Sequence, residues 1–162
     1  MTEKVKETKE TKVLDMEQKR ADKIDKMQQF LTDNKIDCFD VKKIEDERHT
    51  TIFRSRMEVK GQILPMAVLM DDSVYIILQV QIAPQVIPEA KLPELAAAIN
   101  NMNNNVRPFK FTVSEKGDFM LNACITAENN TFNPVLLNAI IGEALKFLEA
   151  QYSNIMEAIW KK

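Results

Sequence analysis

The segment from Gln62 to Met70 (QILPMAVLM) has the pattern of a β-strand that is apolar on both faces. Side chains alternate between the two faces of a sheet along a strand, and here both alternating sets are apolar. One set is Ile63, Pro65, Ala67 and Leu69, and the other is Leu64, Met66, Val68 and Met70. A sheet with one face in water instead shows polar residues in one of its two sets. We therefore expect both faces of this strand to be covered, either by another part of the chain or by a partner.

The segments on either side of this strand each have a single strongly apolar face. In residues 51–59, Phe53, Met57 and Val59 share one face, while charged side chains dominate the other. In residues 74–82, Val, Ile and Leu alternate with a set that becomes polar toward the end of the segment. An acidic turn joins this segment to the doubly apolar strand. A strand that is apolar on both faces fits best between two such neighbours, so we predict that it lies between them.

Two further helices and a hairpin are predicted from the same kind of pattern. Apolar residues recur at helical spacing from Leu14 to Leu31, with charged residues on the other faces. A middle helix begins near Pro93, which suits a first turn, and ends in the asparagines at 100–105. Residues 109–113 and 119–126 alternate as two strands of a hairpin. Residues 36–41 form a short mixed stretch that is compatible with a strand but is not counted among the five.

The last helix has a strong start signal. Asn133 suits the N-cap and Pro134 the first helical position, and the apolar pattern continues to Trp160. Gly142 lies inside this helix, where glycine is unfavourable, so we expect it to allow close packing against the sheet.

The length of 162 residues suits one domain. Residues 1–12 repeat Lys, Glu and Thr with almost nothing to bury, and are expected to be a disordered lead. Residues 13–162 are expected to form a single α+β domain, with a mainly antiparallel five-stranded sheet and three helices. The predicted order is helix, three strands, helix, two strands, helix.

This order of elements resembles the YbjN-domain family over residues 14–160. The resemblance rests on the core strand ILPMAVLM, the hairpin PFKFTVSEKGDFML and the closing helix FNPVLLNAIIGEALKFLEAQYSNIMEAIW. It implies a fold like that of the type III secretion chaperones, an antiparallel sheet with helices packed around it. Those chaperones are dimers that hold extended segments of client proteins. The shared motifs are structural and carry no catalytic residue across.

The sequence holds no recognisable catalytic, metal or cofactor site, so we expect no enzyme and no cofactor. His49 is the only histidine and is predicted to lie in an exposed, charged loop. The three glycines are far apart, which excludes a glycine-rich phosphate loop. The acidic clusters lack the spacing of a calcium loop. Cys38 and Cys124 are expected to be buried, free thiols.

Net charge and hydropathy limit the classes of partner that this chain can have. The net charge of −2 gives no bulk attraction to nucleic acid or to an anionic membrane. The first residues are polar, and no apolar run approaches the ~20 residues that span a bilayer. A cytoplasmic location is therefore the expectation.

The remaining signal is the second face of the doubly apolar strand, which predicts a protein-binding module. We expect either the first or the middle helix to cover this face, or a homodimer seam. The candidate partner-binding residues are Leu64, Met66, Val68, Met70, Tyr75, Ile77 and Met120. The alternative is a regulatory domain that senses a small molecule in a pocket between the sheet and the last helix. That pocket would be lined by Phe147, Tyr152 and Trp160.

Overall fold

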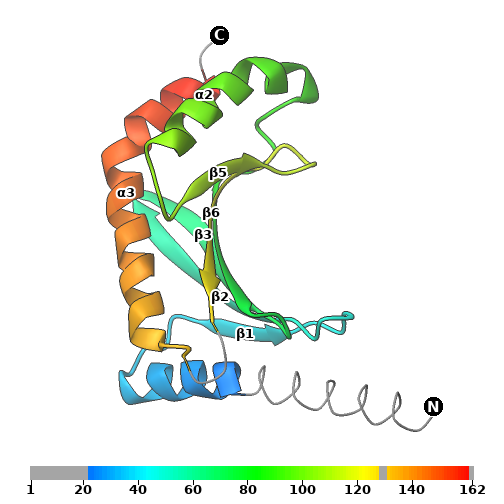
Figure 1. Cartoon of the computed structure of the whole chain (residues 1–162). Helices are drawn as coiled ribbons and strands as arrows, with labels where there is room; N and C mark the ends of the chain where they lie inside the picture. The colour runs from blue at the N-terminus through cyan, green and yellow to red at the C-terminus, as the bar shows by residue number, and fades with distance from the viewer. Residues whose placement is uncertain (1–21, 128–130, 161–162) are drawn as a thin grey trace, which may run out of the picture.

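The computed structural model describes residues 22–127 and 131–160, which form an α+β fold with one antiparallel sheet (Figure 1). The sheet has six strands in the order β1-β2-β3-β4-β6-β5. The strands are β1 (Asp40–Lys43), β2 (Thr51–Val59), β3 (Gln62–Met70), β4 (Tyr75–Ala83), β5 (Lys110–Val113) and β6 (Phe119–Thr126). The helices are an N-terminal helix over residues 22–33, the short 3₁₀ helix η1 (Glu89–Lys91), α2 (Leu92–Asn104) and α3 (Pro134–Trp160). The predicted lead, residues 1–12, and the predicted start of the first helix lie outside the described residues.

The doubly apolar segment is β3, and it lies inside the sheet between β2 and β4, as predicted. Its register with β2 pairs Phe53 with Val68 and Met57 with Leu64. Its register with β4 pairs Val68 with Leu78. These five side chains are buried on the same face of the sheet.

The predicted fold class is confirmed, but the sheet has six strands where five were expected. The additional strand is β1, at one edge of the sheet, paired only with β2. Its sequence is DVKK, and all four residues are exposed. The sequence of residues 36–41 is compatible with a strand, but a strand with no buried side chain shows no apolar alternation, so the pattern did not place it in the sheet.

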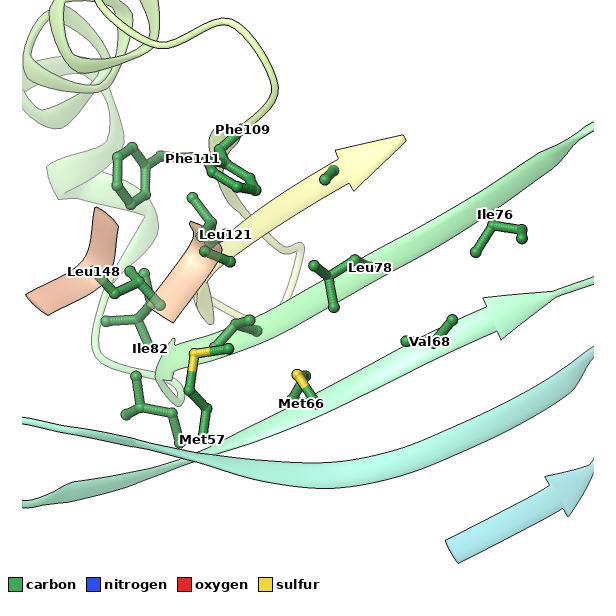
Figure 2. Close-up of a cluster of buried hydrophobic side chains, with 14 of the residues drawn as sticks. Met57, Met66, Val68, Ile76, Leu78, Ile82, Phe109, Phe111, Leu121 and Leu148 are labelled. Carbon is green, nitrogen blue, oxygen red and sulfur yellow. The ribbon is translucent and has the colours of Figure 1, made fainter. Parts of the chain in front are cut away.

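The core lies between the sheet and α3 (Figures 1 and 2). Figure 2 shows Ile82 of β4 and Leu121 of β6 near Leu148 of α3, while Met66 and Val68 of β3 continue the apolar layer along the sheet. The buried residues of α3 recur at alternating spacings of seven and four, which keeps them on one side of the helix. They are Leu137, Ala144, Leu148, Ile155 and Ile159.

The start of α3 is capped as the sequence predicted. The side-chain Oδ1 of Asn133 accepts hydrogen bonds from the backbone N–H of Val135 at 2.9 Å and of Leu136 at 3.3 Å. These bonds satisfy donors that have no partner within the helix. The prediction for Gly142 is wrong, because a Cβ placed there would meet nothing within 4 Å. Close packing therefore does not explain this glycine.

A buried lysine joins the N-terminal helix to the sheet. The helix packs through Ile24, Met27 and Leu31, and the neighbouring Lys23 is fully buried. The Lys23 ammonium donates hydrogen bonds to the backbone carbonyls of Asp71 at 2.9 Å and Ser73 at 2.6 Å, in the turn between β3 and β4. Burial lowers the pKa of Lys23, and the carboxylates of Asp71 and Asp72 oppose that shift.

The outer edge of β5 is covered by a side chain of α2. The Asn103 amide nitrogen donates to the carbonyl of Phe111 at 3.0 Å, and the Phe111 N–H donates to the Asn103 Oδ1 at 2.7 Å. Asn103 therefore makes the two bonds that a neighbouring strand would make to this peptide. Asparagines were predicted to end the helix, and α2 does end at Asn104.

Candidate protein-binding face

The sheet face turned away from α3 carries no helix within residues 22–127 and 131–160 (Figure 1). We call it the open face. Figure 1 shows that the strands curve, with α3 along their convex side, so the open face is concave. From the register and the alternation along each strand, its central side chains are Ile52, Arg54, Arg56, Ile63, Pro65, Ala67, Leu69, Ile77, Gln79, Gln81, Met120 and Asn122. The prediction that a helix of this chain covers the second face of β3 is not met in the described residues.

The open face contains a hollow of about 960 Å³. It is lined by Cys38, Asp40, Arg54, Ser55, Arg56, Ile63, Pro65, Met66, Ala67, Gln79, Gln81 and Met120. The volume lies within the range of sites that bind compact ligands or segments of chain. Ile63 is 64% exposed, which is unusual for a large aliphatic side chain on an interior strand.

One row of side chains across the middle of this face is polar except for Ala67. The register places one residue from each strand side by side across the sheet, from β1 to β5. The row is Asp40, Arg54, Ala67, Gln79, Asn122 and Lys110. A second row on the same face is apolar and runs through Ile52, Leu69 and Ile77. The open face therefore combines apolar contact area with side chains that can form hydrogen bonds.

The seven candidate partner-binding residues do not share one face. Leu64, Met66, Val68 and Met70 belong to the core, with exposures of 4%, 6%, 0% and 0%. Tyr75, Ile77 and Met120 belong to the open face. The apolar positions of β3 on the open face are instead Ile63, Pro65, Ala67 and Leu69. Because both sets of β3 are apolar, the pattern alone could not decide which set faces α3. Whether any of these residues binds a partner stays a prediction.

The residues predicted to line a sensor pocket are also separated. A pocket of about 390 Å³ lies between α2, β5 and α3, and Phe147 is among its lining residues. Tyr152 packs against the core and Trp160 is 59% exposed, and neither lines this pocket.

The prediction that both cysteines are buried is wrong, because Cys38 and Cys124 are free and exposed. Cys124 pairs in register with Ile77 on the open face, and Cys38 lines the hollow. Three strands separate β1, which follows Cys38, from β6, which holds Cys124. The core-side set of β6 is entirely apolar, whereas Cys124 belongs to the mixed set on the open face, with Met120 and Asn122.

The loop that contains His49 is exposed, as predicted. The His49 Nδ1 lies 2.8 Å from a carboxylate oxygen of Asp72, in the neighbouring β3–β4 turn. Among the described residues, no three His, Cys, Asp or Glu side chains are grouped so that they could hold a metal ion. None of the described helices has the length and apolar character needed to cross a membrane.

Sequence reasoning missed the polar members of the open face. The pattern placed Arg54 and Arg56 on the charged side of their strand, and Gln79 and Gln81 on the polar side of theirs, but it did not join them to a protein-binding face. The signal was available, since all four belong to the alternating sets opposite the core residues. Only the register shows that these sets meet the second apolar set of β3.

No protein-family model matches the chain, and no curated protein matches it. Among solved structures, the chain is similar to one in the crystal structure of the ExsC-ExsE complex, with 15% sequence identity and a TM-score of 0.41. The match covers 65% of this chain and 77% of the other.

Proposed function

We propose that this chain is a non-enzymatic protein-binding module that holds an extended segment of another protein in its open face. One observation carries the proposal: an interior sheet face with apolar side chains is left uncovered by the described chain and is hollowed by about 960 Å³. Large uncovered apolar surfaces on proteins are commonly interaction sites. The proposal includes kinship with the YbjN-domain family, which the motifs of β3, the β5–β6 hairpin and α3 support.

The curvature of the open face favours a segment over a second copy of the chain. Two identical concave faces placed against each other would meet mainly at their rims and would leave the hollow empty. An extended segment is narrow enough to enter the hollow and to place alternate side chains against β3. If the protein is a homodimer, we expect the seam to lie outside the open face.

The test fills the hollow and measures peptide binding. Ala67→Trp places a large side chain in the middle of the open face, on a strand position where aromatic residues are well tolerated. We expect the wild-type protein to bind a subset of 13-residue peptides on an array of varied composition, and the variant to lose at least 10-fold in affinity for them. Ala150→Trp is the matched control, because Ala150 is exposed on α3, away from the open face.

Thermal unfolding of both variants shows whether the fold is retained. If folded Ala67→Trp binds the same peptides as strongly as wild type, or if wild type binds no peptide, the open face is not the binding site and the proposal is wrong.

The pocket between α2, β5 and α3 favours a second candidate function, the sensing of a small molecule. Its 390 Å³ lie within the usual range of small-molecule sites. Aromatic rings of Phe111 and Phe147 and several side-chain amides line it. A ligand that binds only the folded state raises the unfolding temperature. A shift with a metabolite library that is lost in Phe147→Ala and kept in Ala67→Trp would support this candidate, and no shift with any metabolite would count against it.

A further inference from the structure

We propose that the segment held in the open face carries acidic side chains at positions i and i+2, and that Arg54 and Arg56 bind them. This inference rests on the proposed function and specifies the chemistry of the partner. Both arginines lie on β2, both are exposed, and both line the hollow.

The two guanidinium groups have no partner within the described part of the chain. Neither makes a hydrogen bond or an ion pair there. Two acidic side chains lie near them on the same face, Asp40, which pairs in register with Arg54, and Glu58, two positions from Arg56 on β2, and neither forms an ion pair with the arginines. The other cross-strand neighbours of Arg54 and Arg56 are Ala67 and Pro65, which are apolar. Arginines whose donors are unused beside an apolar hollow are suited to bind a carboxylate of a partner.

The charge of the hollow has the opposite sign to that of the whole chain. Its charged lining residues are two arginines and one aspartate, a net charge of +1, while the chain carries −2. An acidic segment is therefore attracted to the hollow itself, although the protein as a whole carries a negative charge and does not attract it. Charge complementarity of this kind gives specificity.

The spacing of the arginines sets the spacing of the partner's acids. Residues two apart on a strand lie roughly 6.6–7 Å apart and point to the same side. An extended segment alongside β2 has the same repeat, so acidic residues at i and i+2 would face the two guanidinium groups. The glutamines on β4, Gln79 and Gln81, offer both donors and acceptors to the polar groups of such a segment.

The test uses three synthetic peptides with identical Gly-Ser flanks and fluorescence anisotropy at low salt. The first has the centre Val-Glu-Val-Glu-Val, and the second has Gln in place of both Glu. The third, Val-Glu-Glu-Val-Val, keeps the charge but places the acids on opposite sides of an extended chain. We expect the first peptide to bind wild type about tenfold or more tightly than either of the others. We also expect its advantage to shrink at 0.5 M NaCl, because salt screens exposed charges.

The double variant Arg54→Gln, Arg56→Gln should bind the first two peptides equally. A matched control is Lys146→Gln, an exposed cation on α3 whose loss should leave the preference unchanged. If wild type binds the Glu and Gln peptides alike, the inference is wrong, while the proposed function stands as long as Ala67→Trp weakens that binding. If light scattering shows a wild-type dimer that the double variant dissociates, the arginines bind a second copy and the inference is also wrong.

Discussion

Replacing Lys23 with methionine should destabilise the fold by removing the link between the N-terminal helix and the β3–β4 turn. Methionine keeps most of the aliphatic length of lysine but cannot donate hydrogen bonds. The backbone carbonyls of Asp71 and Ser73 would lose their bonds to the Lys23 ammonium, which are 2.9 and 2.6 Å long. The carbonyls would remain partly buried beneath the helix.

Two opposing effects determine the size of the loss. A carbonyl left buried without a partner costs about 1–3 kcal/mol, and two carbonyls are affected here. Against this, the variant avoids burying an ammonium group, whose desolvation is large enough to lower the pKa of Lys23 despite two nearby carboxylates. The two unpaired carbonyls together would cost about 2–6 kcal/mol, and the avoided desolvation offsets part of this cost. We therefore expect the free energy of unfolding to fall by about 2 kcal/mol.

Urea unfolding followed by far-ultraviolet circular dichroism measures this loss directly. Lys26→Met is the matched control, because Lys26 is exposed on the same helix, and its effect should stay within about 0.5 kcal/mol. A Lys23→Met protein as stable as wild type would refute the reasoning, because the hydrogen bonds would then contribute no more than the desolvation costs.

The pH dependence gives a second check. Lys23 has a lower pKa in the folded than in the unfolded chain, where it takes its ordinary value of 10.5. As the pH rises toward 10.5, the unfolded chain therefore holds the proton longer than the folded one. The stability of wild type relative to Lys23→Met should accordingly rise over this window, and a fall would contradict the assigned direction.

Three further substitutions have expected outcomes. Gly142→Ala should raise the free energy of unfolding by about 0.5–1 kcal/mol in thermal or urea unfolding, because a Cβ meets no neighbour there; a loss would mean that the helix packs more closely at this point. Asn133→Ala should lower it by about 1 kcal/mol through loss of the N-cap, whereas Asn138→Ala, within the same helix, should not destabilise it. Asn103→Ala should expose the peptide of Phe111 and increase self-association in concentration-dependent light scattering, and an unchanged mass would show that this edge is protected by other means.

Patterns that depend on a single buried face were sufficient to predict most of the fold. Alternation in β2 and β4 and the Asn133 start signal of α3 each follow from local chemistry, and the structure confirms them. The exposed strand β1 buries nothing, so the mixed pattern of residues 36–41 was not sufficient to place it in the sheet. In β3, both alternating sets of side chains are apolar, so the sequence could not show which set faces the core. Only the position of α3 decides this.

The polar part of the site depends on contacts between distant segments. Arg54 faces Ala67 and Gln79 only because three strands align in one register. Lys23 is buried by a turn about fifty positions away, and one lysine among the charged residues of a helix carries no sign of that. Such features follow from tertiary packing and are not encoded in any local window of sequence.

The pairing of Asn103 with Phe111 also limits how this protein can polymerise. A chain that can accept a new strand at both borders of its sheet can add copies without end and form a fibre. Here the β5 border is occupied at Phe111, while the β1 border, in the described residues, pairs with β2 alone. With only the β1 border free, pairing through β1 would join two molecules into a dimer. No free border would then remain for a third copy to extend the sheet into a fibre.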